Sequence, residues 1–349
     1  MLLDRKDVWI GKILPFVGMG QYAFVSGVNK QLNQLYKEYG AAVKDPPRVM
    51  KSSESKQTWQ KISATSTDTF YGNTFCNLTL AKFWLDDKSG KNHMRTGEAC
   101  RVIAKVGNLT VLQWALEQEL FPWSELRFGA CLDAAIYGHL EILKWARENK
   151  CEWDSSTCFL ASRCGHLDIL KWAHENGCPW AEETCAAAAE FGHLDILKWA
   201  REHGCPWTAN TCAEAAGGGN LEVLKWAVAN GCPWNWTTCT EAAHGGHLEI
   251  LEWAKENGCP WNASTCSAAA GSGHLDILKW ARENGCPWDA NTCSSAAEGG
   301  HFELLKWARE NGCPWDANTC SAAAKGGHLE ILQWARENGC PEQGREDES

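Results

Sequence analysis

The feature that most constrains this chain is a 27-residue repeat that occupies most of its length. The segment Gly-His-Leu-Asp-Ile-Leu-Lys-Trp-Ala recurs with little change, and the residue in its histidine position returns every 27 residues. A fixed period of this length is typical of chains built from stacked supersecondary units. Single units of this size cannot bury enough surface to fold alone, so we expect a continuous array. The repeating position is occupied by His139, His166, His193, Asn220, His247, His274, His301 and His328.

The same repeat explains an unusual composition of 21 Trp and 19 Cys. Each unit carries one Trp in its second half, such as Trp280, and another after Cys-Pro, such as Trp288. Each unit also has two cysteine slots, as at Cys178 and Cys185. An odd number of cysteines behind a charged N-terminus favours reduced thiols over a disulfide scaffold. We therefore predict that the cysteines and the tryptophans are core residues.

Helix signals divide each unit into two helices. In residues 289 to 313, Thr292 is a candidate N-cap of a short first helix, and the glycines at 299 and 300 end that helix. A second helix is expected from residue 301 to residue 310, followed by Gly312 and Pro314. A 27-residue period also suits leucine-rich repeats, but these need a strand of alternating apolar residues that the units lack. Helix pairs are the predicted unit.

At this point the repeats resemble a known family. A pattern close to Ala-Ala-x-x-Gly-His-Leu-Glu-Ile-Leu, followed by Glu-Asn-Gly, occurs at residues 296 to 312 and 323 to 339, and it is similar to the ankyrin repeat. The units are shorter than the usual 33 residues, and Cys-Pro-Trp stands where the hairpin finger begins. The resemblance implies an all-α, ankyrin-type helix-pair solenoid with trimmed hairpin loops. It would cover residues 70 to 340, with about nine units and a degenerate half-unit.

A separate helical module is expected at residues 1 to 39, joined by a linker over residues 40 to 69. The pattern Ile-Leu-x-Phe-Val, followed by Tyr-Ala-Phe-Val-Ser-x-Val, resembles an F-box, which docks on the Skp-type adaptor of cullin-RING ubiquitin ligases. The alternative is a helical cap that covers the end of the solenoid. Residues 341 to 349 are an acidic tail. The resemblance assigns adaptor docking to Ile13, Leu14, Phe16, Val17, Val25 and Val28.

Charge and hydropathy exclude two classes of partner. The formal net charge is −10, and residues 127 to 340 hold 16 Lys and Arg against 27 Asp and Glu. This surface repels a phosphate backbone, so we predict no nucleic-acid binding. No apolar run approaches the roughly 18 residues of a membrane span, so no membrane association is expected. The charged N-terminus lacks the apolar core of a signal peptide, which predicts a cytoplasmic location, with the nucleus as the alternative.

The recurring Cys and His suggest two roles. As ligands, Cys178, Cys185 and His193 could hold a soft metal, but six and seven intervening residues are longer than zinc pairs use. As core residues, the thiols are small and apolar, and the His column forms a hydrogen-bonding ladder in which Asn220 replaces one member. We favour the second role. No nucleophile or base recurs beside these residues, so we expect no enzyme, metal or cofactor.

The units differ from one another at the exits of the first helices and in the loops before them. The ankyrin resemblance implies that this region is the recognition face, although neutral variation on a solvated surface would give the same pattern. We predict a non-catalytic scaffold for protein partners with basic or amphipathic segments. The alternative is a substrate-recognition subunit of an F-box/cullin-RING ubiquitin ligase. Candidate partner-binding residues are Arg163, Glu183, Glu190, Asn210, Trp236, His244, Glu298 and Lys325.

Overall fold

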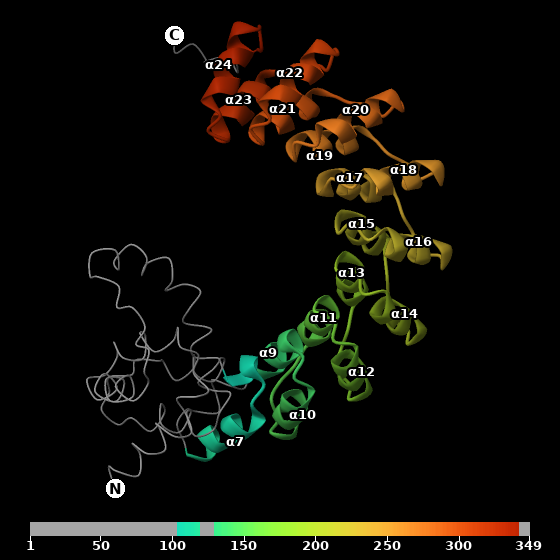
Figure 1. Cartoon of the computed structure of the whole chain (residues 1–349), viewed down its shortest axis with the longest axis vertical. Coiled ribbons are helices and arrows are strands. Elements are labelled where there is room, and N and C mark those ends of the chain that lie inside the picture. The colour runs from blue at the N-terminus through green and yellow to red at the C-terminus, as the bar shows by residue number, and fades with distance from the viewer. Residues whose placement is uncertain (1–102, 119–128, 342–349) are drawn as a thin grey trace, which may run out of the picture. The chain divides into compact units, whose positions relative to one another are not determined.

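The computed structural model describes residues 103 to 118 and 129 to 341, whose regular secondary structure is entirely α-helical (Figure 1). This confirms the all-α fold class. The chain divides into two units, Met1–Glu152 and Trp153–Ser349. The expected F-box-like module at 1 to 39, the linker at 40 to 69 and the acidic tail after residue 341 lie outside the described residues.

Helices of eight to ten residues follow one another in pairs. In the first unit they are α7 (Leu109–Glu117), α9 (Ala130–Tyr137) and α10 (Leu140–Glu148). In the second unit the first helices of the pairs are α11 (Ser155–Arg163), α13 (Glu182–Glu190), α15 (Ala209–Gly217), α17 (Trp236–Gly245), α19 (Ala263–Gly271), α21 (Ala290–Glu298) and α23 (Ala317–Lys325). The second helices are α12 (Leu167–Glu175), α14 (Leu194–Glu202), α16 (Leu221–Ala229), α18 (Leu248–Glu256), α20 (Leu275–Glu283), α22 (Phe302–Glu310) and α24 (Leu329–Glu337).

The first helices begin at an N-cap that the sequence pattern misplaced. In α21 the cap is Asp289, whose Oδ1 accepts a hydrogen bond from the amide of Asn291 at 3.0 Å. The prediction that Thr292 caps this helix was wrong, because Thr292 lies inside the first turn and is completely buried. Asp154, Asn235, Asn262 and Asp316 cap their helices in the same way.

The second helices begin directly after the repeated His or Asn, as predicted. Except in α14, where His203 takes this place, the second helices of the second unit end on an asparagine whose side-chain amide folds back on the helix. Asn284, for example, donates from Nδ2 to the carbonyl of Trp280 at 2.9 Å. Gly285 follows in the left-handed conformation, with φ of +80°, which a glycine adopts without steric cost.

In the second unit, each first helix packs on the first helix of the next pair and on its own second helix. The first helices lie along the inner side of the curved row and the second helices along its outer side (Figure 1). Contact is close because the facing residues are small: Cys212, Ala215 and Ala216 of α15 are completely buried. The larger core residues come from the second helices, such as Ile277 and Leu278.

A ladder of side-chain hydrogen bonds joins successive pairs, which confirms the predicted role of the His column. His247 donates from Nε2 to the carbonyl of Gly217 at 3.0 Å, and His301 donates to Gly271 at 3.0 Å. Asn220 performs the same task, because its Nδ2 donates to the carbonyl of Glu190 at 2.7 Å. Each such bond ties the exit of one first helix to the start of a second helix in the next pair.

The repeated cysteines of the described residues are buried, as predicted, whereas Cys164 is partly exposed, and no cysteine in this part of the chain forms a disulfide. Within a unit, the thiol of the first helix interacts with the thiol that follows the second helix, as Cys212 does with Cys232, and the Sγ of Cys232 donates to the carbonyl of Thr208 at 3.4 Å. The interaction with Cys232, followed by burial, raises the pKa of Cys212 far above the ordinary thiol value, so the group stays neutral. Burial raises the pKa of Cys340 to about 12. The thiols therefore act as small apolar core residues.

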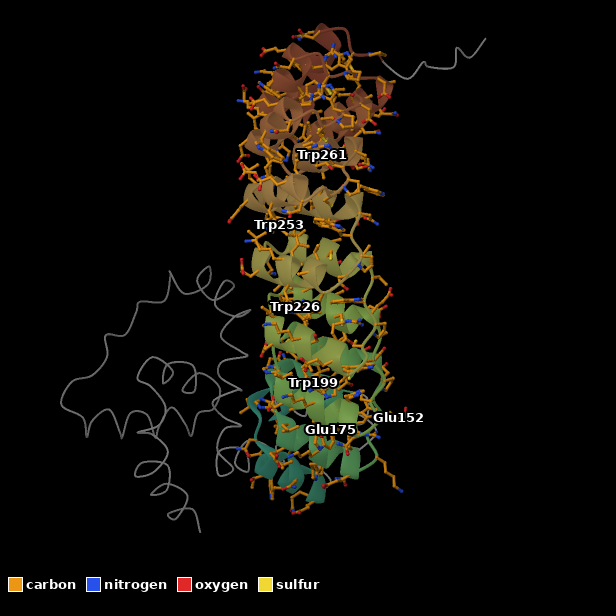
Figure 2. All side chains as sticks on the ribbon, turned by 90° about the vertical axis from the view of Figure 1, so that its right-hand side faces the viewer. Glu152, Glu175, Trp199, Trp226, Trp253 and Trp261 are labelled. Carbon is orange, nitrogen blue, oxygen red and sulfur yellow. The ribbon has the colours of Figure 1, made fainter. Side chains whose placement is uncertain are left out.

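The repeated tryptophans of the described residues are half-buried, which corrects the prediction that the Trp columns are core residues. Each Trp after Cys-Pro packs on the second-helix Trp of the next pair, edge-to-face in most pairs, as Trp207 does on Trp226 with ring centroids 6.0 Å apart, and tilted at 48° for Trp234 on Trp253. A cation covers many of these indoles, and Arg201 lies 4.0 Å from the centroid of Trp207. Figure 2 shows Trp199, Trp226 and Trp253 along the outer side.

The connections between pairs are short, in agreement with the predicted trimming of the hairpin loops. From α20 to α21 the chain needs only residues 284 to 289, and the described residues contain no strand. Across the part of the chain that the structure describes, no helix has the length and apolar character required to cross a bilayer.

The His ladder predicts a selective effect of alanine at the left-handed glycines. In Gly246→Ala the new Cβ would lie 2.7 Å from Cε1 of His274, whereas in Gly258→Ala it would meet nothing within 4 Å. Both residues have φ of +80°, so both variants carry the same backbone strain of about 1 to 2 kcal/mol. Only Gly246→Ala also disturbs the bond from His274 to the carbonyl of His244, which adds about 1 kcal/mol. Thermal unfolding should show the lower midpoint for Gly246→Ala; equal midpoints would contradict the ladder.

Candidate interaction surface

The predicted recognition residues of the repeats all lie on first helices, and therefore along the inner side of the second unit (Figure 1). Each of them lies either in the first turn or in the last turn of its helix. Glu183, Asn210 and Trp236 belong to the first turns of α13, α15 and α17. The remaining five lie in the last turns, namely Arg163, Glu190, His244, Glu298 and Lys325. The six adaptor-docking residues, Ile13, Leu14, Phe16, Val17, Val25 and Val28, lie outside the described residues.

Two aromatic side chains are exposed on this surface. Trp236 is the first residue of α17 and is 42% exposed, in a slot that holds Ala in the pairs that begin at α15, α19, α21 and α23. Phe191 follows α13 and is 41% exposed, with the guanidinium of Arg163 at 5.0 Å from its ring centroid. Both lack the scaffold role of the repeated indoles. Large apolar side chains in such positions are typical anchors of protein interfaces.

Several predicted residues are already engaged with each other or with neighbours. Lys325 donates to Glu298 at 2.9 Å, an ion pair between successive first helices. His244 shares a hydrogen bond with the hydroxyl of Ser272 at 2.8 Å. These contacts leave the charged groups exposed, so they remain accessible to another molecule. Exposed pairs of this kind contribute little to stability.

Three carboxylates from successive first helices form the acidic part of the surface. Burial raises the pKa of Glu214 above its ordinary value, and the negative charges of Glu190 and Glu241 raise it further. The amide of Asn210, 3.4 Å from Glu214 Oε1, opposes this effect. Burial is the largest cause of this shift, and the contributions of Glu190 and Glu241 indicate that like charges on α13, α15 and α17 lie close enough to repel one another. A cation bound here would relieve that repulsion.

A step without side chains lies beside these carboxylates. Gly217 and Gly218 occupy the exit of α15, where the preceding pair carries Glu190 and Phe191 and the next pair carries His244 and Gly245. A Cβ on Gly217 would lie 3.4 Å from Cβ of Glu241, which places this backbone against the acidic side chain of the next helix. At the exit of α15 the inner side therefore has no side chains that project outward, and Phe191 and the acidic groups lie beside this place.

The slot comparison predicted Glu190 but missed Glu214 and Glu241. Both occupy the sixth residue of their first helices, a slot that holds Ala268, Ser295 and Ala322 in later pairs. The signal was present as two charged residues in a slot of small ones. The predicted recognition face comprised only the helix exits and the preceding loops, whereas the middle of each first helix also reaches this surface.

No set of three or more His, Cys, Asp or Glu within residues 103 to 118 and 129 to 341 is arranged to hold a metal ion. The Cys and His columns are separate in space because the thiols face the core and the imidazoles bond to exit carbonyls. The features that this surface presents to another molecule are its charged groups and its exposed aromatic side chains.

The chain resembles solved structures in its fold. No family model matches this chain, and no curated protein matches it. It is similar to the human ASB11 ankyrin repeat domain. The identity is 18%, the alignment covers 45% of this chain and 84% of that domain, and the TM-score is 0.37.

The crowded carboxylates predict a pH-dependent gain of stability in Glu214→Gln. Because the folded-state pKa of Glu214 is raised, its ionised form destabilises the fold at pH 7, and this effect disappears when acid protonates the group. We expect Glu214→Gln to raise the free energy of unfolding at pH 7 by less than about 1 kcal/mol, and to match the parent near pH 3. Glu222→Gln is the control, because Glu222 pairs with Lys225 at 3.1 Å and its loss should give no gain. Denaturant unfolding at both pH values checks this.

Proposed function

We propose that this chain is a non-catalytic protein-interaction scaffold. Partners bind on the inner side of the second unit, across the exposed faces of α11, α13, α15, α17, α19, α21 and α23. The preferred partner presents a basic or amphipathic segment. The observation that carries this proposal is the joint placement of exposed Phe191 and Trp236 with three crowded carboxylates on successive helices.

The contrast with the outer side supports this choice of surface. On the outer side the indoles are paired with one another and covered by the chain's own cations, as Lys255 covers Trp261 at 4.2 Å. On the inner side, acidic groups lie beside like charges, and Trp236 is exposed at the start of its helix. Complementary charge steers a partner and aligns it, while desolvated aromatic anchors supply most of the affinity.

Charge reversal tests the surface without altering the core. The variant Glu183→Lys, Glu190→Lys, Glu298→Lys should weaken binding of a lysine-rich amphipathic helical peptide by about tenfold or more. The matched control, Glu256→Lys, Glu283→Lys, Glu310→Lys, makes the same charge change at exposed ends of second helices and should bind much more tightly. Fluorescence anisotropy with the full chain measures both. Equal weakening in the two variants would show that only net charge matters and would overturn the proposed surface.

The aromatic anchors have their own matched substitutions. Trp236→Ala and Phe191→Ser introduce residues that equivalent slots already hold at Ala263 and Ser272, so folding should be preserved. Their combination should reduce capture of partner proteins from a lysate, quantified by mass spectrometry against the parent chain. If the captured set is unchanged while the melting temperature is also unchanged, the inner side is not the docking surface.

A second candidate function rests on the N-terminal segment. The pattern Ile13-Leu14-x-Phe16-Val17, with Val25 and Val28 further on, is F-box-like and favours a substrate-recognition subunit of a cullin-RING ubiquitin ligase. In that case these residues dock a Skp-type adaptor while the repeats hold the target. Copurification of the full chain with a Skp-type adaptor should be lost in Leu14→Asp. Absence of any association in the parent chain would end this candidate.

A further inference from the structure

Two histidines depart from the repeat pattern at neighbouring places on the outer side. His174, in the last turn of α12, stands in the slot that holds Arg201 and Arg282 in other units. His203 follows α14, where other units carry asparagines such as Asn230. The repeats need neither imidazole, since the other residues build the same helices.

The fold brings these two side chains together from separate units of the repeat. Their ring centroids are 6.3 Å apart, with an interplanar angle of 81°. His174 stacks on Trp180 at 3.8 Å, and His203 stacks on Trp199 at 4.3 Å. The two indoles touch edge to face at 5.7 Å, so four rings form one continuous cluster. Figure 2 shows Trp199 on this outer side, together with Glu175.

The hydrogen bond of His203 sets its tautomer. Its Nδ1 lies 2.8 Å from the carbonyl oxygen of Trp199, and a carbonyl can only accept, so Nδ1 carries the proton. This leaves the lone pair of neutral imidazole on Nε2. Histidines that bind metals are commonly held in this way, with the second ring nitrogen donating to a backbone carbonyl.

We propose that His174 and His203 together bind one divalent late transition-metal ion. Imidazole nitrogen is a ligand that Cu²⁺, Zn²⁺ and Ni²⁺ all accept, and Cu²⁺ binds most tightly among them. A metal–nitrogen distance of about 2.0 to 2.1 Å puts an ion about 3.2 Å from each ring centroid. The centroids of two ligating rings therefore lie about 5 to 6.4 Å apart, depending on the angle between the two metal–nitrogen bonds. The observed separation of 6.3 Å lies at the upper end of this range, which places the two nitrogens on nearly opposite sides of the ion, an arrangement that the tetragonal geometry of Cu²⁺ accommodates. Water completes the coordination of this two-ligand site.

The surroundings of the pair favour binding in two ways. Stacking on Trp180 and Trp199 restricts both imidazoles before an ion arrives, which lowers the entropy lost on binding. Exposed Glu175 and Glu202 are adjacent to the histidines in sequence and offset the charge of Lys171, which lies 5.9 Å from the centroid of Trp199. Because the ligands come from α12 and α14, an ion would also bridge two helix pairs.

Titration of the full chain tests the site directly. Zn²⁺ followed by calorimetry should show one equivalent that a chelator removes, and Cu²⁺ should quench part of the tryptophan fluorescence at the same stoichiometry. Bound ion should raise the melting temperature, because it binds the folded state only. Acid should abolish binding, since protonated imidazole has no lone pair to donate. A chain that binds neither ion overturns the proposal.

Substitutions that restore the repeat separate this site from adventitious binding. His174→Arg and His203→Asn introduce the residues of neighbouring units, and an asparagine at 203 keeps the bond to the helix carbonyl, as Asn176 does with Trp172 at 2.8 Å. Both variants should fold and should lose affinity by at least about tenfold. His244→Gly is the control, because Gly217 and Gly271 occupy the equivalent slots, and it should bind as the parent does. Unchanged affinity in either restored variant, or equal loss in His244→Gly, would overturn the assignment.

Discussion

The close approach between the exit of one first helix and the histidine of the next pair is the constraint on which the repeat depends. A left-handed glycine makes it possible, as at Gly300, where φ is +78° and a Cβ would lie 2.4 Å from Cε1 of His328. The imidazole fills that space and donates to an exit carbonyl. Every unit that keeps this contact keeps the spacing that buries its thiols and alanines against the next first helix.

Because the scaffold depends on a fixed set of positions in each unit, the other positions can carry different residues from one unit to the next. Glycine, histidine, buried cysteine and alanine hold the layers together, and none of them needs the exposed face of the first helix. Substitutions such as Trp236 or Glu241 can therefore accumulate there without disturbing the stacking. This is the physical basis for locating recognition on the inner side of the second unit.

The outer side is organised differently, because its aromatic area is already satisfied. Paired indoles gain about 0.5 to 1.5 kcal/mol from edge-to-face geometry, and stacked cations such as Arg282 over Trp288 add a similar amount. His174 replaces the arginine of other units and His203 replaces their asparagine, and both imidazoles stack on an indole. These two replacements supply imidazole nitrogens that can bind a metal ion, at a place where other units have only packing contacts. The two proposals concern opposite sides of the repeats, so each can fail without the other.

The period alone determined the helix pairs, the buried thiols and the His ladder, since each depends on which residue recurs in a slot. The tertiary structure decided which residues of different units come into contact and how far each side chain is buried. It placed Asp289 instead of Thr292 at the helix start, left the indoles half-buried, gathered Glu190, Glu214 and Glu241, and brought His174 to His203. A repeat pattern records the environment of each position within one unit. The offset between stacked layers determines which positions of successive units meet, and that offset depends on how the whole array packs.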